Sequence, residues 1–265
     1  MPNVWDDKSL VNPHEVADKG RRVQRMFAAI APSYDLNNRL HTLWMDQSWR
    51  RRAVKLAELQ TTDRVVDVAC GTGDLTLAFF EGLSRINFPV KPDLIPAQVL
   101  GIDFTHEMLP IAVSKWTKAA ATAQTAVQSI QFISGDAQSL PLPDACCDVV
   151  SVSFGIRNVA NPATAVREFL RILRPGGRLL ILEFSLPTNP VFRAFYNFYF
   201  KQVLPRTATW ISGDQTGAYK YLPQSVRTFI DRQTMVEMMT YAGFQRVTQK
   251  PFTFGICVCY RGFKN

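Results

Sequence analysis

The sequence has no uninterrupted apolar run approaching the roughly 18 residues that a membrane-spanning helix needs. Its five cysteines are an odd number in a chain of 265 residues, which argues against a disulfide framework. The pairs Cys146-Cys147 and Cys257-x-Cys259 lack the two-residue interval and the histidine partners of a zinc site, so we expect no bound metal. The first residues contain neither a basic segment nor an apolar one, and a secretory leader is not expected.

Charged residues are also sparse, at 20% of the chain against 47% hydrophobic residues, which is typical of a globular protein with a large core. Lys and Arg number 30 and Asp and Glu 22, giving a net charge of +8. A surplus of positive charge favours binding to nucleic acid or to an anionic membrane surface, unless it is incidental. Apart from Arg21-Arg22 and Arg50-Arg51-Arg52 the basic residues are scattered, and we expect no nucleic-acid partner.

Short apolar and β-branched runs alternate with helical segments along the middle of the chain. The expected strands are 64–70, 99–103, 130–136, 148–153 and 178–184, with a closing hairpin at 244–249 and 255–260. The expected helices are 74–83, 105–123, 162–173 and 234–242. Apolar strands separated by helices indicate an α/β fold, a mostly parallel sheet with helices on both faces.

We predict a single domain, 1–265, in four parts. These are a helical amino-terminal cap at 1–59, a core at 60–185, an insertion at 186–230, and a closing helix and β-hairpin at 231–265. Residues 1–20 are polar and are expected to be weakly held. The helix over 22–59 is expected to break at Pro32 and Asn37-Asn38. The residue pattern of 190–204 predicts a helix with a wide aromatic face. That face is expected to pack on the sheet, to line a substrate channel or to touch a membrane.

Ligands of parallel α/β sheets bind beyond the carboxyl ends of the strands. The first strand ends in Gly71-Thr72-Gly73, where the backbone can approach a ligand, although a structural turn explains two glycines equally well. The second ends in Asp103, whose carboxylate can accept both hydroxyls of a ribose. Asp136-Ala137 follows the third, where an acceptor suits an adenine amino group, and Ser153 ends the fourth. The four ends together are far more specific than any one of them.

This combination resembles the class I S-adenosylmethionine-dependent methyltransferases. Their first loop typically reads acidic-x-G-x-G-x-G, whereas this chain has Asp67-x-Ala69-x-Gly71-x-Gly73, with alanine at the first glycine. The resemblance narrows to the ubiquinone/menaquinone biosynthesis C-methyltransferases. The motifs that carry it are Ala31-Pro-Ser-Tyr34-Asp35, Ser153-Phe-Gly-Ile-Arg157-Asn158-Val159, Leu173-Arg-Pro-Gly-Gly-Arg-Leu, Tyr219-x-Tyr-Leu-x-x-Ser225 and Ala242-Gly-Phe244.

The chain departs from that family's pattern in three places. Asp46 stands where a histidine is frequent, which weakens a catalytic role for that position. Ile230 stands where a proline is usual, and the loop over 83–99 is longer than typical. The last two departures are expected to affect loop geometry alone.

The resemblance implies a Rossmann-like, mostly parallel seven-stranded sheet, with S-adenosylmethionine as the methyl donor. The implied cofactor-binding residues are Gly71, Thr72, Gly73, Asp74, Asp103, Asp136, Ala137 and Ser153. The implied reaction is C-methylation of a prenylated quinol, first of all demethylmenaquinol to menaquinol. Methylation of 2-polyprenyl-6-methoxy-1,4-benzoquinol in ubiquinone biosynthesis is the alternative, and the sequence does not choose between the two rings.

Three residues are the catalytic candidates that the resemblance implies. Arg157 is the first choice to stabilise a phenolate, and Tyr34 and Asp35 would orient the phenol or relay its proton. A structural ion pair for Arg157 and a core or capping role for Tyr34 and Asp35 stay open. None of the three histidines lies in a matched motif, so no histidine base is predicted.

The resemblance also implies a cytoplasmic enzyme that associates peripherally with the inner, anionic face of the membrane, and it leaves a homo-oligomer open. Two other function classes remain. A nucleic-acid methyltransferase is disfavoured because Ser153-Phe-Gly-Ile replaces the Asn/Asp-Pro-Pro-aromatic run of amino-group methylases. A cofactor-binding assembly subunit without catalysis is disfavoured because Arg157 and Tyr34 are retained.

Overall fold

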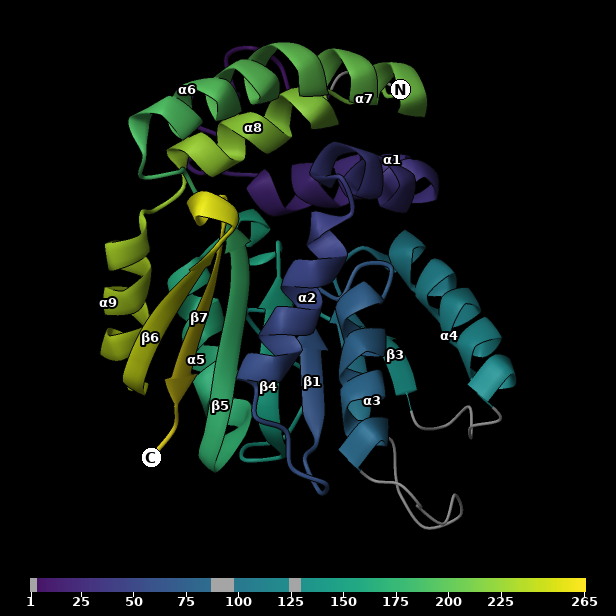
Figure 1. Ribbon diagram of the computed structural model, residues 1–265, viewed down its shortest axis with the longest axis vertical. Coiled ribbons are helices and arrows are strands. Elements are labelled where there is room, and N and C mark those ends of the chain that lie inside the picture. Colours follow the sequence, from purple (N-terminus) through teal and green to yellow (C-terminus); the bar gives the residue numbers. More distant parts are fainter. Residues whose placement is uncertain (1–3, 87–97, 124–129) are drawn as a thin grey trace.

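The computed structural model describes residues 4–86, 98–123 and 130–265, and these form one seven-stranded sheet of order β3-β2-β1-β4-β5-β7-β6 (Figure 1). The strands are β1 (Val65–Val68), β2 (Val99–Asp103), β3 (Ile130–Ser134), β4 (Cys147–Ser153), β5 (Leu173–Phe184), β6 (Gln245–Phe252) and β7 (Cys257–Phe263). Strands β1 to β5 are parallel, and β7 is antiparallel to both of its neighbours. The predicted fold class is therefore confirmed, while the expected loop at 88–96 lies outside the described residues.

Helices cover both faces of the sheet (Figure 1). One face is covered by α2 (Met45–Leu56), α3 (Asp74–Ile86) and α4 (Leu109–Ala123). The other is covered by α5 (Pro162–Ile172) and α9 (Arg232–Ala242). Phe79 of α3 and Phe169 of α5 are fully buried, one in each core, and β1 between them is buried at all of its residues. This burial on both sides explains why the strands are apolar almost without interruption.

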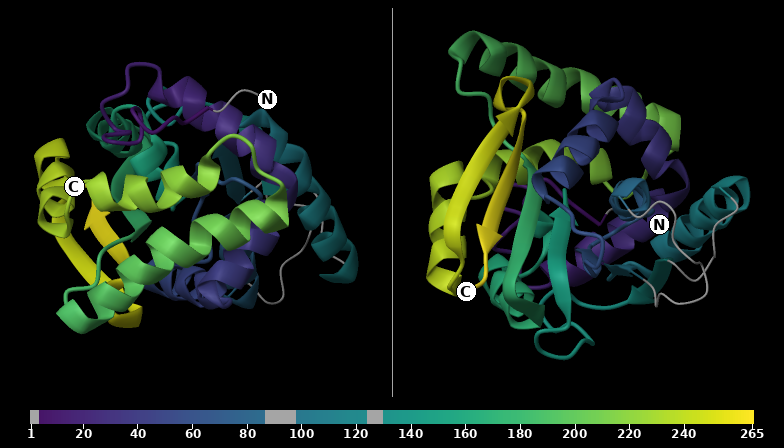
Figure 2. Two further views of the ribbon diagram at one scale, coloured as in Figure 1. Left: turned by 90° about the horizontal axis from the view of Figure 1, so that it is seen from above. Right: turned by 60° about the horizontal axis from the view of Figure 1, so that its bottom comes forward.

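A cap of helices lies over the carboxyl ends of the parallel strands (Figure 1). It consists of α1 (Lys19–Thr42), α6 (Pro190–Phe198), the π-helical turn η5 (Tyr199–Val203), α7 (Leu204–Ser212) and α8 (Ala218–Thr228). Seen from above, α7 and α8 lie side by side across the top of the molecule (Figure 2, left). The cap has an apolar core of its own, which includes Met26, Ile30 and Tyr221. It closes the edge of the sheet at which ligand-binding residues are predicted.

The prediction that residues 1–20 are weakly held is wrong for the described part of that segment. Trp5 is fully buried and stacks on Tyr221 of α8, with ring centroids 4.4 Å apart. Arg22 of α1 lies over the Trp5 ring and donates from Nη1 to the carbonyl oxygen of Val4 at 2.8 Å. A single tryptophan in a polar stretch has no periodicity from which its burial can be predicted.

The predicted break in the first long helix is also wrong, because α1 continues through Pro32 and Asn37-Asn38. Pro32 has no backbone N–H, so the helix lacks one hydrogen bond at this residue. Packing of the buried face of α1 on the cap core stabilises the helix nevertheless. Asn37 is buried and donates from Nδ2 to the carbonyl oxygen of Ser33 at 3.2 Å. The chain breaks instead at Leu43 and Trp44, which both have left-handed backbone conformations.

Residues 190–212 do not form one regular α-helix. The π-helical turn η5 separates α6 from α7, and Pro205 follows directly in the first turn of α7. Because proline has no N–H, a carbonyl one turn earlier lacks its α-helical partner, which explains the wider turn at this place. The turn carries Tyr199 and Phe200, and Tyr199 reaches α1.

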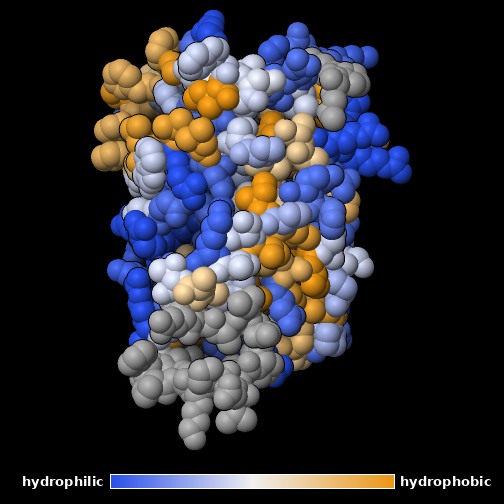
Figure 3. Space-filling view, turned by 90° about the vertical axis from the view of Figure 1, so that its right-hand side faces the viewer, coloured by the Kyte–Doolittle hydropathy of each residue, from blue (hydrophilic) through white to orange (hydrophobic). Residues whose placement is uncertain are grey.

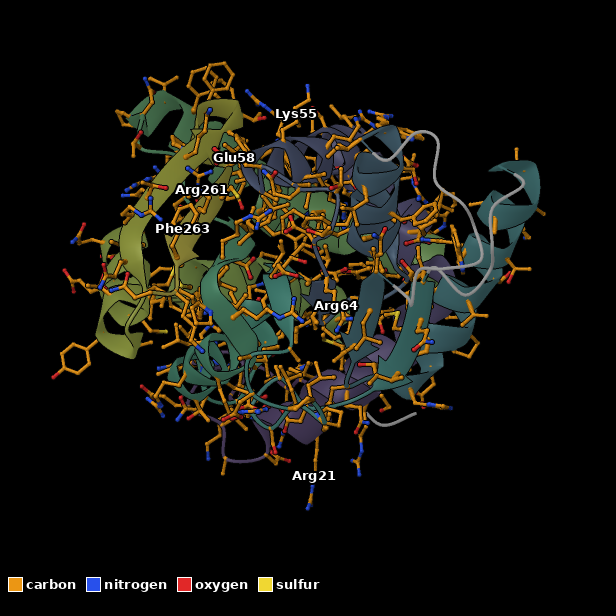
Figure 4. All side chains as sticks on the ribbon, turned by 90° about the horizontal axis from the view of Figure 1, so that it is seen from below. Arg21, Lys55, Glu58, Arg64, Arg261 and Phe263 are labelled. Atoms are coloured by element: carbon orange, nitrogen blue, oxygen red, sulfur yellow. The ribbon has the colours of Figure 1, made fainter. Side chains whose placement is uncertain are left out.

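Arg261 fastens the closing hairpin to the segment between α2 and β1. Its Nη1 donates to Glu58 Oε1 at 2.6 Å and to the carbonyl oxygen of Leu56 at 2.9 Å. Figure 4 shows Arg261 beside Glu58, with Phe263 next along β7. The hairpin thereby completes one side of the sheet, with β6 as the edge strand opposite β3.

Candidate active site

A cavity that opens in part to solvent lies beyond the carboxyl ends of β1 to β4. Five of the predicted cofactor-binding residues line it: Gly71, Asp103, Asp136, Ala137 and Ser153. From the cap, α1 contributes Val23, Phe27 and Tyr34. The structure thus brings together the four strand ends that the sequence singles out, and it covers them with α1. We call this space the first cavity.

The loop after β1 requires its glycines for two different reasons. Gly71 and Gly73 both have positive φ, of 56° and 83°. A Cβ on Gly73 would lie 3.1 Å from the Cβ of Ala112 and 3.2 Å from the ring of Phe132, so this glycine also permits close packing. Ala69, at the place of the first glycine of the motif, has a φ of 53°, which costs an alanine about 1–2 kcal/mol.

Asp103 holds this loop to the end of β2. Its Oδ2 accepts a hydrogen bond from the Gly71 N–H and its Oδ1 from the Thr105 N–H, each at 2.7 Å. The carboxylate is buried, and this burial raises its pKa above the usual value, although the two backbone hydrogen bonds oppose the shift. Each carboxylate oxygen has a further lone pair, so Asp103 can accept hydrogen bonds from a ligand in the first cavity.

Asp136 occupies the equivalent place after β3. Its Oδ1 accepts a hydrogen bond from the Gln138 N–H at 2.9 Å, which fixes the turn that follows the strand. The neighbouring Gly135 donates its N–H to the carbonyl oxygen of Asp103 at 3.0 Å. The two acidic strand ends are therefore connected through the backbone, and both line the first cavity.

Three other predicted residues, Asp35, Thr72 and Asp74, form a polar cluster and do not line the first cavity. Lys115 of α4 lies 2.5 Å from Asp35 Oδ2 and 2.6 Å from Asp74 Oδ1. Thr72 donates from Oγ1 to Asp35 Oδ1 at 2.6 Å. Burial opposes ionisation of Asp74, but the charges of Arg50 and Lys115 outweigh it and lower the pKa of Asp74. The cluster ties α1 and α4 to the glycine loop.

A second cavity lies between α1, α2, the strand ends and the other cap helices. Its lining is mainly apolar and includes Phe184, Phe200, Leu204, Leu222 and Val226. Two buried arginines also line it, each with a carboxylate partner at 2.6 Å: Arg50 with Asp46, and Arg157 with Glu183. Tyr34 and Phe154 line both cavities, so the two spaces adjoin.

Arg157 is 3% exposed and is held by three groups. Its Nη1 donates to Glu183 Oε1 at 2.6 Å and to the carbonyl oxygen of Phe154 at 2.7 Å, and its Nε donates to Ser225 Oγ at 3.3 Å. Within the described residues its Nη2 has no hydrogen-bond partner. The structural ion pair that the sequence leaves open is therefore present, and one donor group remains for a ligand of the second cavity.

Phe154 stands where the two cavities meet and has a φ of 55°, an unusual conformation for an aromatic residue. Its N–H donates to the carbonyl oxygen of Leu182 at 2.7 Å, which helps to hold this strained position. Tyr34, the other shared residue, has a pKa that burial raises above its usual value. Its phenol stays protonated at neutral pH and can donate a hydrogen bond to a ligand, but it is a poor base.

Sequence reasoning missed two contributors to the second cavity. Arg50 pairs with Asp46 one helical turn earlier, and that spacing of opposite charges is a signal visible in the sequence. His41 also lines the cavity and bonds Tyr199, which is 158 residues away. No local pattern connects these two residues.

Comparison with known proteins places the chain in a family. The family model of the ubiE/COQ5 methyltransferase family matches residues 15–264. The chain belongs to the ubiE/COQ5 methyltransferase family. The demethylmenaquinone methyltransferase of Deinococcus radiodurans is 41% identical over 93% of this chain and 94% of its own length. The demethylmenaquinone methyltransferase of Thermus thermophilus is 41% identical over 89% of this chain and 99% of its own length. A ubiquinone/menaquinone biosynthesis C-methyltransferase of a Geobacter species is 39% identical over 95% of this chain and 100% of its own length.

Solved structures agree on the fold of this ubiE/COQ5 methyltransferase. A crystal structure of an S-adenosylmethionine-dependent methyltransferase from Thermotoga maritima superposes on this chain with a TM-score of 0.61 at 18% sequence identity. The match covers 92% of this chain and 100% of the Thermotoga chain. The predicted family, the enzyme class of C-methyltransferase and the cofactor S-adenosylmethionine are confirmed.

The first cavity suits that cofactor. Asp103 and Asp136 offer acceptors to the hydroxyl and amino groups of an adenosine, and glycine at position 71 leaves space where a ligand approaches the backbone. Phe27 and Met108 supply apolar surface for a ring system. Asp74 and Lys115 pair with each other at 2.6 Å beside the glycine loop and do not line this cavity.

Proposed function

We propose that this enzyme transfers a methyl group from S-adenosylmethionine to a ring carbon of a prenylated quinol, with demethylmenaquinol as substrate and menaquinol as product. The second cavity carries the proposal, because it is an apolar space with a buried cation that adjoins the cofactor cavity at Tyr34 and Phe154. Two relatives with 41% identity bear the name demethylmenaquinone methyltransferase. A 2-polyprenyl-6-methoxy-1,4-benzoquinol is the alternative, since other relatives are named for both quinones.

The sulfonium of S-adenosylmethionine supplies an activated methyl group, so the protein has to align the ring carbon and make it nucleophilic. A quinol carbon becomes nucleophilic when the adjacent phenol ionises. A phenol with a pKa near 10 costs roughly 4 kcal/mol to ionise at neutral pH. A preorganised donor in a space that excludes water offsets such a cost.

Arg157 is the residue that we assign to this task. Its guanidinium is immobilised by Glu183 and Phe154, so little reorganisation accompanies the charge that develops on the phenol oxygen. Tyr34 orients the ring by donating a hydrogen bond. Asp35 is engaged by Lys115 and Thr72, and we assign it to positioning the glycine loop.

A methylation assay with both chemically reduced demethyl quinols tests the assignment. Demethylmenaquinol is expected to give the higher kcat/KM, and preference for the benzoquinol would select the alternative. Failure of a folded, donor-binding protein to methylate either ring would overturn the proposal.

A membrane surface is the place where we propose that the enzyme meets this substrate. Within the described residues no helix is long and apolar enough to cross a membrane. Large apolar side chains are nevertheless exposed on α6 and at the tip of the β6–β7 hairpin: Val191, Phe192, Phe195, Phe198 and Phe254. Figure 3 shows hydrophobic side chains gathered near the top of the molecule, at the level of the cap helices. The exposed bases Arg193, Arg206 and Lys250 flank these elements and suit an anionic lipid surface.

Vesicle flotation checks the membrane contact. Burying a phenylalanine gains about 1.5–3 kcal/mol, so the double variant Phe195→Ser, Phe198→Ser is expected to bind phosphatidylglycerol vesicles at least tenfold more weakly. Tyr241→Ser is the matched control, because Tyr241 is 96% exposed on α9. Equal flotation of the double variant and the control would contradict the contact.

The basic side chains labelled on the lower face do not favour the nucleic-acid alternative. Arg21, Lys55 and Arg64 lie on separate parts of the face in Figure 4 and form no continuous stripe. Nucleic-acid binding of functional strength requires several phosphate contacts on one surface.

A further inference from the structure

The second cavity contains a histidine whose chemistry the proposed reaction has not used. His41 lies near the end of α1 and lines this cavity together with Tyr34 and Arg157. Its Nδ1 is 2.9 Å from the hydroxyl of Tyr199 in η5. Its Nε2 is buried and has no hydrogen-bond partner among the described residues. A buried polar atom without a partner is costly unless a ligand supplies one.

The hydrogen bonds of Tyr199 favour one tautomer of His41. The Tyr199 hydroxyl also donates to the carbonyl oxygen of His41, at 3.3 Å. A phenol has one proton to donate, so both contacts are satisfied together only when Nδ1–H donates to the Tyr199 oxygen. In this tautomer Nε2 carries a free lone pair. A π-helical turn such as η5, which presents Tyr199, is a rare element that is often found at functional sites.

We propose that His41 is the general base of the methyl transfer, accepting the phenolic proton of the quinol on Nε2, and that Tyr199 is its positioning residue. This inference rests on the proposed function. It adds a catalytic residue that lies outside every motif by which the sequence resembles its family.

The proton and electron balance of the step is complete. The phenol O–H bond breaks, its proton forms an N–H bond at Nε2, and the electron pair stays on the oxygen and is delocalised onto the ring. The ring carbon then bonds the methyl carbon, and the electron pair of the broken sulfur–carbon bond stays on sulfur. The ring C–H proton leaves to water, and His41 returns its proton to the phenol oxygen. One proton is released per turnover.

The surroundings keep His41 neutral at physiological pH, which a base requires. Burial lowers the pKa of His41 below its usual value of 6.5. The titratable and charged groups that line the cavity with it are Tyr34, Asp46, Arg50 and Arg157, and Tyr199 contacts it from η5. The charges of Arg50 and Arg157 are each balanced by a paired carboxylate, so desolvation dominates. Tyr34 and Tyr199 both stay protonated, since burial raises the pKa of each.

Nitrogen-15 NMR of the full-length protein tests the tautomer without any turnover. The chain has three histidines, and a His41→Asn variant identifies the signals of His41 by their loss. We expect a neutral Nδ1–H tautomer whose Nε2 resonance shifts when 1-naphthol, a phenol that lacks the second ring hydroxyl of a quinol, is added. In Tyr199→Phe the tautomer preference should weaken. An Nε2–H tautomer in the wild-type protein would overturn the proposal.

Kinetics provide the second arm. General-base catalysis contributes about 10²–10⁴-fold, so His41→Asn should lower kcat at least 100-fold while KM and S-adenosylmethionine affinity change little. The decline of wild-type kcat on the acid side should disappear in this variant, and added imidazole should partly restore the activity of His41→Gly. His106→Asn is the matched control, because His106 is exposed and does not line the second cavity. A His41→Asn enzyme as active as this control would overturn the proposal, whereas an inactive wild-type enzyme would refute the proposed function instead.

Discussion

Arg157 and Glu183 form an ion pair of 2.6 Å in which both side chains are almost completely buried, at 3% and 2% exposure. Arg157 follows β4 and Glu183 lies near the end of β5, so the pair joins two neighbouring strand ends. Burial raises the pKa of Glu183, while the charge of Arg157 and the backbone hydrogen bonds oppose the shift. The pair immobilises a buried guanidinium beside Phe154, at the junction of the two cavities.

Replacing Arg157 by lysine should reduce catalysis more than folding. Lysine keeps the charge but cannot donate to Glu183, Phe154 and Ser225 in the same fixed geometry. We expect kcat to fall about 10²–10³-fold, the usual cost of losing one preorganised donor. Arg174→Lys, whose arginine pairs with Asp148 at the opposite end of the sheet, should retain activity in the same steady-state assay. Equal losses in both variants would contradict the role of Arg157.

Replacing Ala69 by glycine should stabilise the protein. Ala69 has positive φ, and relieving that strain exceeds the entropy that glycine loses on folding, leaving a net gain of up to about 1 kcal/mol in the free energy of unfolding. Urea denaturation measures the change. Ala119→Gly, in the helical conformation of α4, should lower the same free energy by about 1 kcal/mol. A change of the same sign in both variants would show that the strain at Ala69 is not relieved.

Replacing Asp103 by alanine should weaken cofactor binding. The substitution removes the acceptor of the Gly71 and Thr105 N–H groups and a ligand-facing carboxylate. A hydrogen bond to a charged group contributes about 1.5–3 kcal/mol, so we expect the Kd for S-adenosylmethionine to rise at least tenfold in isothermal titration calorimetry. S-adenosylhomocysteine, which has the same adenosine, should lose as much affinity. Asp148→Ala serves as control, because Asp148 also accepts a backbone N–H but lies away from both cavities. Unchanged affinity in Asp103→Ala would remove Asp103 from the site.

Acidification should destabilise the protein through His14. Its Nε2 is 2.9 Å from the carbonyl oxygen of Ser225, and burial lowers its pKa from 6.5 to about 4. Below pH 6.5 the unfolded chain takes up a proton that the folded state resists, so stability is full above pH 6.5 and falls as the pH drops toward 4. The urea midpoint of the wild-type protein should decrease across this window, and that of His14→Gln should decrease less. Parallel curves for the two proteins would exclude His14 as a source of the acid sensitivity.

The sequence predicts the sheet and the strand-end residues well, because both are local signals. The apolar runs that form β1 to β5 and the residues Gly71, Asp103 and Asp136 at their ends are visible within a few positions of one another. The cap is harder to predict. Trp5 on Tyr221 and His41 on Tyr199 join segments more than 150 residues apart, and packing of α1 overrides the helix-breaking tendency of Pro32.

The second cavity shows the same limit. It is assembled from α1, α2, the strand ends and the cap helices, so no window of the sequence contains it. Arg157 is predictable because it lies in a motif, and the spacing of Asp46 and Arg50 is visible in the sequence. The contact of Arg157 with Glu183, 26 residues away, emerges only from the fold.

The most direct test of the central claim is to locate the transferred methyl group. The enzyme is incubated with S-adenosylmethionine carrying a ¹³C-labelled methyl group and with chemically reduced demethylmenaquinol, and the product is analysed by NMR and mass spectrometry. The account predicts that the label appears as a methyl group on a ring carbon, giving menaquinol. Label on a quinol oxygen, or no transfer by a folded protein that binds S-adenosylmethionine, would contradict it.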